Sequence, residues 1–197
     1  MPENCNRRLP LTAAQTGMWF AQQLDPQNPI YKCGEYIDIQ GAVDLAVVEV
    51  AVRQAVADTE ALLVRVEVDD DGTLWQVVDR EVEWPLPVLD LRDTVNPWAQ
   101  AQEWMRAELS QPIDLRHAPV FSFTVLQLAT DRFLLHISAH HLALDGVGFS
   151  LVVQRIAEVY TALEAGRECP PSNLGSLDLL LADEAQTSGC ATNAERS

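Results

Sequence analysis

The chain has 197 residues, of which 48% are hydrophobic and 21% charged, as in an ordinary globular protein. Its 13 lysine and arginine residues are outnumbered by 29 aspartate and glutamate residues, giving a net formal charge of −16. A field of that sign repels nucleic-acid phosphates and anionic lipids, so we expect neither a nucleic acid nor a membrane as partner. There is no apolar run of about 18 residues and no signal peptide, which predicts a cytoplasmic protein.

The first half of the chain alternates helical and extended patterns. Thr12 and Asp44 are suited to cap helices, and Asp-Gly at 71–72 is a strong signal for a hairpin turn. In chain order, the predicted elements are a polar arm over 1–10, a helix over 13–24, a strand over 30–39, a helix over 45–58, and two strands over 62–68 and 73–79.

The second half continues in the same mixed order. The predicted elements are a strand over 86–90, a helix over 97–109, a hairpin of strands over 119–128 and 132–139, and a helix over 149–164. Helices that alternate with hairpins favour a two-layer α/β (α+β) sandwich with a mixed sheet over a doubly wound parallel sheet. We therefore expect one lobe over 11–166, followed over 167–197 by a linker and a short helix.

The residue types suited to chemistry are concentrated in the stretch SAHHLALDG, residues 138–146. Adjacent side chains on a strand point to opposite faces, so we expect one of His140 and His141 to face the sheet packing and the other a cleft. An imidazole in a cleft is suited to accept a proton from an attacking amine or hydroxyl. The alternative is that both histidines are packed and hydrogen-bonded, while Asp145 caps the next helix.

A metal site has little support in the sequence. His136, His140 and His141 are near one another, and His117 lies upstream, but no HExxH, CxxC or HxH spacing occurs. No phosphate-binding glycine loop and no GxSxG elbow are present either. We expect no bound metal and no nucleotide chemistry.

Four motifs together resemble the condensation domains of nonribosomal peptide synthetases. HHLALDG fits the HHxxxDG pattern of that family, and LTAAQTGMW near the N-terminus is similar to its opening motif. EALLVRV resembles the RHExLRTxF region, and QPIDL with the following AP resembles the segment before the long strand. The motifs occur in the family's order across residues 9–165, and the flanking stretches look most like siderophore-type synthetases.

This resemblance implies a chloramphenicol-acetyltransferase-like lobe, one of two set in a V. It further implies amide formation between an acyl or aminoacyl donor thioester and an acceptor amine, both carried on phosphopantetheine arms of carrier proteins. No cofactor would be bound to the domain itself. His141 would be the catalytic second histidine, and His140 and Asp145 would be structural. Gly146 would let the backbone pass close to the thioester.

Two departures from the family pattern bear on these expectations. Asp58, Thr59 and Leu63 stand where the RHExLRTxF region has charged or imidazole side chains, which leaves Arg65 as the nearest partner for Asp145. The chain also has the length of the first lobe alone, so we expect a C-terminal lobe as partner and an inactive isolated chain. An uncovered lobe face would also favour self-association.

Three other functions remain open from the sequence. An epimerisation domain shares the HHxxxDG pattern, and a coenzyme A-dependent acyltransferase of the wider superfamily needs only HxxxD. A non-catalytic lobe that docks carrier proteins would need neither histidine for chemistry. Products of condensation domains include siderophores and antibiotics, and the sequence does not name the donor or the acceptor.

Overall fold

The computed structural model describes the backbone of residues 7–194 and the side chains of residues 7–186. At its centre lies a four-stranded sheet in the order β2-β7-β6-β5. These strands are β2 (Lys32–Gln40), β7 (Arg132–His140), β6 (Phe121–Ala129) and β5 (Val88–Asp90). β5 runs parallel to β6 and the other pairs are antiparallel, so the predicted mixed sheet is confirmed.

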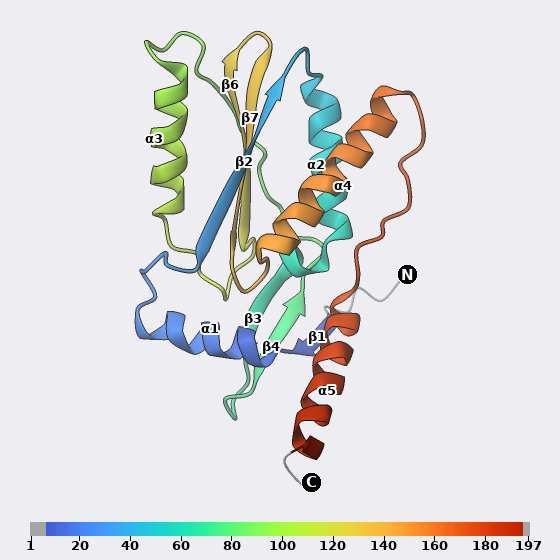
Figure 1. Ribbon diagram of the computed structural model, residues 1–197. Coiled ribbons are helices and arrows are strands. Elements are labelled where there is room, and N and C mark those ends of the chain that lie inside the picture. The colour runs from blue at the N-terminus through green and yellow to red at the C-terminus, as the bar shows by residue number, and fades with distance from the viewer. Residues whose placement is uncertain (1–6, 195–197) are drawn as a thin grey trace.

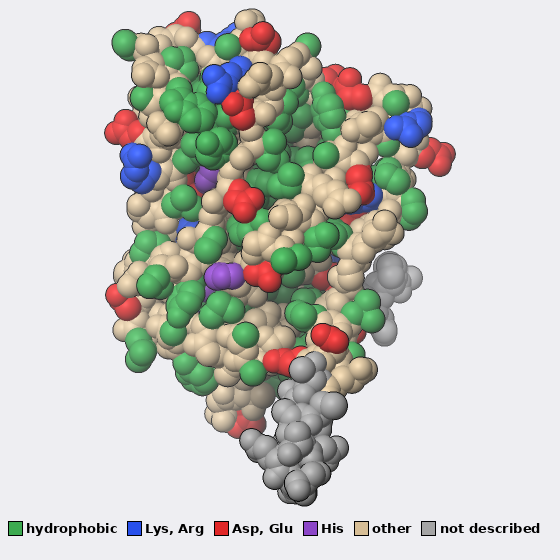
Figure 2. Space-filling view, viewed as in Figure 1, with side chains coloured by type: hydrophobic (Ala, Val, Ile, Leu, Met, Phe, Trp, Pro, Cys, Tyr) green, Lys and Arg blue, Asp and Glu red, His purple; other side chains and the backbone are tan. Residues whose placement is uncertain are grey.

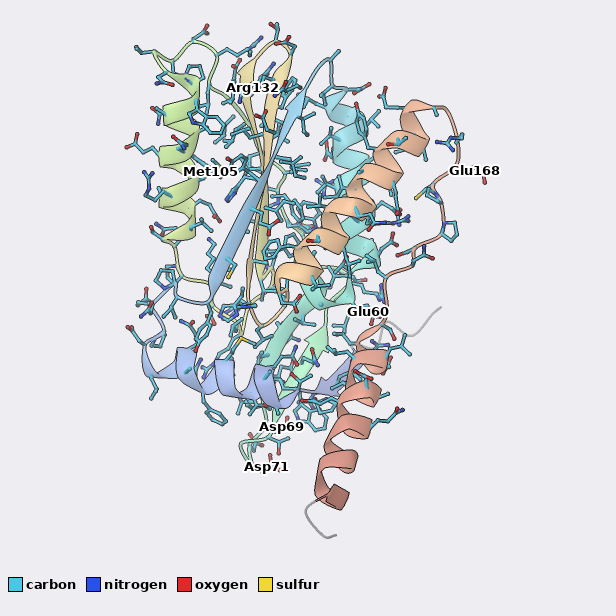
Figure 3. All side chains as sticks on the ribbon, in the orientation of Figure 1. Glu60, Asp69, Asp71, Met105, Arg132 and Glu168 are labelled. Carbon is cyan, nitrogen blue, oxygen red and sulfur yellow. The ribbon has the colours of Figure 1, made fainter. Side chains whose placement is uncertain are left out.

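Helices pack on both faces of this sheet, so it lies between two helical layers and not beneath the single one that a two-layer sandwich has (Figure 1). α2 (Leu45–Asp58) and α4 (Gly146–Glu164) lie together on one face, and α3 (Pro97–Leu109) lies on the other. Met105 of α3 packs against the sheet in a smaller apolar cluster (Figure 3). The hairpin face that the alternation predicts is fully packed in the main core, and its members are Phe121, Phe123, Val125, Phe133, Leu135 and Ile137.

A second, three-stranded antiparallel sheet lies below the first in Figure 1. Its order is β1 (Arg7–Pro10), β4 (Leu74–Val78) and β3 (Val64–Val68), and a 3-10 turn over Glu60–Leu63 leads into β3. Residues 7–10 are therefore strand rather than polar arm, because β4 offers them an edge with which to pair. Residues 1–6 of the predicted arm lie outside the described residues.

Two further helices border the molecule. α1 (Ala13–Leu24) crosses the lower edge in Figure 1, and its predicted cap is confirmed because Thr12 accepts a hydrogen bond from the Gln15 amide. α5 (Leu177–Ala194) follows the linker and is longer than the predicted short helix. None of the helices within residues 7–194 is long and apolar enough to cross a bilayer.

The face shown in Figure 2 is rich in apolar side chains, over α1 and along α4. Large hydrophobic side chains are exposed on these helices, among them Phe20 and Leu24 of α1 and Val147 and Leu151 of α4.

Candidate active site

His140 is the last residue of β7 and is buried, with 2% of its surface exposed. Its Nδ1 accepts a hydrogen bond from the Leu142 amide at 3.0 Å, so the ring proton belongs on Nε2, which lies 3.5 Å from the Gln22 Oε1 atom. Burial, and next the neighbouring His141, lower the pKa of His140 to about 4. The ring is therefore neutral at physiological pH and lies buried within the packing.

His141 is the first residue after β7 and, unlike His140, is exposed. Its backbone amide donates to the Tyr31 carbonyl at 2.7 Å, and its Nδ1 lies 3.0 Å from the Leu144 carbonyl oxygen. A carbonyl only accepts hydrogen bonds, so Nδ1 carries a proton. In the neutral form of the ring the lone pair therefore lies on Nε2, which makes no hydrogen bond to the described residues and is suited to act as a base. The structure thus separates the two histidines as strand alternation predicts.

Asp145 caps α4 and, among the described residues, does not form the expected ion pair with an arginine. Its carboxylate accepts a hydrogen bond from the Gly148 amide at 2.7 Å and so caps the helix, which starts at Gly146 instead of near 149. Arg65, the partner that the sequence suggested, forms its ion pair with Glu67 at 2.5 Å. Arg65 and Glu67 lie two residues apart on the same face of β3, so the Arg65 side chain meets Glu67 on its own strand.

The two glycines of the loop differ in what surrounds them. A Cβ added at Gly146 would meet no atom of the described residues within 4 Å, so this side of the loop is open. A Cβ added at Gly148 would come within 2.9 Å of the Leu144 side chain. Gly148 therefore lets the end of the Leu144 side chain pack closely against the first turn of α4.

Replacing Asp145 with alanine is expected to lower the free energy of unfolding by about 1 kcal/mol, the usual cost of losing a helix N-cap. The carboxylate is exposed and caps a helix, so no uncompensated buried charge is left behind. Urea unfolding measures this loss, and Asp145→Asn, which keeps an acceptor oxygen, is the matched control. A loss of several kcal/mol would show that Asp145 has a buried charged partner after all.

The depressed pKa of His140 predicts a pH-dependent stability. Between pH 6.5 and about 4 the unfolded chain takes up a proton that native His140 does not, so the free energy of unfolding falls as the pH is lowered through this window. Urea unfolding at stepped pH measures the slope. His140→Gln is expected to flatten it but not abolish it, since burial also lowers the pKa of His136. An unchanged slope in His140→Gln would contradict this assignment.

Two glutamines of α1 hold the histidine loop in place. Gln15 is buried and its side-chain amide donates to the Leu142 carbonyl at 3.2 Å, so α1 is tied to the residue after His141. Gln22 donates to three backbone carbonyls of the turn after α1, at Asp25, Pro26 and Asn28, and its oxygen faces His140. Gln15 belongs to the quoted opening motif, whereas no sequence pattern pointed to Gln22.

A pocket of about 590 Å³ opens beside His141. The histidine loop forms one side of it, α1 another, and the first turns of α5 a third. Most of its lining is apolar, and the members with that character are Ala14, Met18, Ala61, Leu142, Ala143, Leu144, Leu177 and Leu180. An apolar pocket with one free imidazole nitrogen suits a ligand that has an apolar body and a reacting group at one end.

The remaining histidines do not build a metal centre. His136 is buried on the α3 side of the sheet, with the Trp104 ring edge-on at 5.7 Å, and His117 is paired with Asp114. Within the described residues no three histidine, cysteine, aspartate or glutamate side chains are grouped so as to hold a metal ion.

Comparison with known proteins gives matches over most of the chain. The family model described as "Condensation domain" matches residues 6–176. The dimodular nonribosomal peptide synthase of Bacillus subtilis is 41% identical over 189 residues, which are 96% of this chain and 8% of that protein. Enterobactin synthase component F of Escherichia coli O157:H7 is 32% identical over 169 residues, 85% of this chain and 13% of that protein.

Solved structures match over a similar range. A variant of the starter condensation domain of rhizomide synthetase RzmA, in complex with C8-CoA, superposes with a TM-score of 0.89 and 38% sequence identity. The match covers 95% of this chain and 43% of that one. The chain thus spans less than half the length of this solved domain and a small part of the curated relatives.

Proposed function

The chain belongs to the condensation-domain family, and from that premise we propose that it is the N-terminal, histidine-bearing lobe of a domain that forms an amide from an acyl thioester and an amine. The observation that carries the proposal is the orientation of His141. The Leu144 carbonyl fixes the proton on Nδ1, and Nε2 stays free next to the pocket. This is the arrangement required of a general base.

In the proposed step the amine nitrogen attacks the thioester carbonyl carbon, so a C–N bond forms and the C–S bond breaks. His141 Nε2 accepts the proton that the amine loses, and the proton then passes to the departing thiolate sulfur. No acyl-enzyme is formed and the enzyme is regenerated unchanged. The imidazole keeps its orientation throughout, because the Leu144 carbonyl stabilises the protonated ring as well as the neutral one.

The donor is an acyl group with an apolar body. The pocket beside His141 is lined mainly by aliphatic side chains, and the starter domain that resembles this chain is solved with C8-CoA. Asp145 and Glu184 at the pocket disfavour an acid group on the donor. The thioester would reach His141 on the phosphopantetheine arm of a carrier protein, in the cytoplasm.

A C-terminal lobe would complete the site. The solved relative is more than twice as long as the stretch it shares with this chain, and Val147 and Leu151 of α4 are exposed at 67% and 44%. We assign that apolar face to the second lobe, and in its absence to self-association. Holding amine and thioester together accounts for about 7–11 kcal/mol of such barriers, so the chain by itself would have no turnover.

The test uses the chain together with a separately produced C-terminal lobe, an octanoyl-loaded donor carrier and an aminoacyl-loaded acceptor carrier. Mass spectrometry of the acceptor arm identifies the product. An octanoyl amide on the acceptor supports the proposal. Deuterium exchange at the acceptor α-carbon would instead indicate an epimerisation domain. Transfer from free coenzyme A alone would indicate a coenzyme A-dependent acyltransferase. Carrier binding without any product would indicate a non-catalytic docking lobe.

A further inference from the structure

One face of α5 forms a wall of the pocket beside His141. Leu177, Leu180 and Glu184 all line it, and their spacing of three and seven residues places them along a single helix face. Ala14 and Met18 of α1 line the same pocket, spaced four residues apart on their helix. The pocket is therefore bounded by two helices that belong to opposite ends of the described chain.

Glu60 anchors the start of this wall. Its carboxylate accepts a hydrogen bond from the Leu177 amide at 3.1 Å and ion-pairs with Arg7 at 2.6 Å and Arg80 at 2.5 Å (Figure 3). Burial by itself raises the pKa of the Glu60 carboxyl. The hydrogen bond from the Leu177 amide and the two guanidinium groups lower the pKa by more, so it lies below its usual value. A charged carboxylate at the first turn also suits the helix dipole of α5. Asp178 adds a second ion pair with Arg7, at 2.8 Å.

Glu184 anchors the wall two turns further on. Its carboxylate accepts a hydrogen bond from the Ala13 amide at 2.8 Å, an amide of the first turn of α1 that has no partner within its own helix. α1 is in turn fixed to the histidine loop by Gln15, through the Leu142 carbonyl. The α5 face is thus tied at both ends to elements that position His141.

Leu180 is the apolar residue of this wall whose side chain can be changed in size without disturbing the core. Leu177 has 4% of its surface exposed and belongs to the core, whereas Leu180 is 50% exposed and still lines the pocket. A change at Leu180 therefore alters the space beside His141 without opening a cavity in the core.

We propose that α5 limits the length of the donor acyl group, with Leu180 as the specificity-determining side chain and Glu60 and Glu184 as the positioning residues. This inference rests on the proposed function, because it assumes that the pocket receives the donor. Each methylene group that fits an apolar pocket is worth about fourfold in affinity, so a shorter or longer pocket changes the ranking of donors by chain length.

The probes are the butanoyl, octanoyl and dodecanoyl thioesters of N-acetylcysteamine, titrated into the full chain by calorimetry. His141 ring signals in NMR report whether each probe reaches the site. Leu180→Trp is expected to weaken octanoyl and dodecanoyl binding by at least about tenfold and butanoyl binding by less than about twofold. Leu180→Ala is expected to favour the dodecanoyl probe. Leu179→Ala is the matched control, because Leu179 is 65% exposed on the same helix and does not line the pocket.

The Glu184 anchor is tested by the same titration. Glu184→Ala is expected to flatten the preference among the three probes, and Glu184→Gln, which keeps an acceptor for the Ala13 amide, is expected to restore it. Circular dichroism confirms that each variant is folded. An unchanged ranking in Leu180→Trp, with the octanoyl probe still shifting the His141 signals, would overturn this inference alone. Failure of every probe to shift those signals in the wild-type chain would overturn the proposed donor site as well.

Discussion

Replacing His141 with alanine is expected to lower the rate of amide formation by about 10²–10⁴-fold, the range of general acid–base contributions. The assay is the two-lobe reaction with loaded carriers, followed under single-turnover conditions. His141 lines the pocket and keeps one ring nitrogen free to accept a proton, since its Nδ1 is engaged by the Leu144 carbonyl. The residue is exposed, so the variant should fold as the wild type does.

The matched control for this variant is Asp145→Asn, which lies in the same loop and keeps an acceptor oxygen for the α4 cap. It is expected to leave the rate within about threefold, because it changes neither the base nor the fold of the loop beside it. Carrier binding, measured separately, should be unaffected by His141→Ala. If that variant kept more than about a tenth of the rate, positioning of the two substrates and not proton transfer would be the main catalytic effect.

Replacing Asp58 with alanine is expected to lower the free energy of unfolding by about 3–5 kcal/mol. Asp58 ends α2, and its carboxylate binds the Arg155 guanidinium of α4 at 2.8 Å. The Arg155 side chain is only 3% exposed. The carboxylate that remains after the substitution is that of Glu158, which is more exposed and lies 3.6 Å from the guanidinium, so the buried charge is left with a weaker partner. The Pro170 carbonyl, at 2.8 Å from Arg155, is neutral and does not replace the lost carboxylate.

Urea unfolding measures this loss, and α2 itself supplies the control. Glu49 pairs with Arg53 at 2.8 Å on the exposed side of the same helix, and Glu49→Ala should cost no more than about 0.5 kcal/mol. The double variant Asp58→Ala with Arg155→Met should recover part of the stability, because it removes both charges. Equal losses for Asp58→Ala and Glu49→Ala would show that the buried pair contributes no more than a surface pair.

Much of the fold could be predicted because its signals are local. Strand alternation places Phe121 and Phe123 in the core, and the same period of two residues buries His140 and leaves His141 exposed. The helix caps at Thr12 and Asp44 also depend on only a few adjacent residues. Patterns of this kind need no knowledge of distant parts of the chain.

The contacts that sequence reasoning missed join residues far apart in the chain. Arg155 lies 97 positions from Asp58, and Glu184 lies 171 positions from Ala13, so no local pattern links them. The expected pairing of Asp145 with an arginine rests on the family's RHExLRTxF region. This chain departs from that region, and Asp58 stands where the family has its first arginine. In this chain the charge of Asp58 is matched from α4 instead.

The measurement that tests the central claim most directly is the rate of octanoyl transfer to an amine in three mixtures. These are the chain with the C-terminal lobe, the chain alone, and the His141→Ala chain with the C-terminal lobe, each given loaded donor and acceptor carriers. We predict amide at an appreciable rate only in the first mixture. Amide at the same rate from the chain alone, or from the His141→Ala mixture, would contradict the claim that this lobe supplies the base of a two-lobe site.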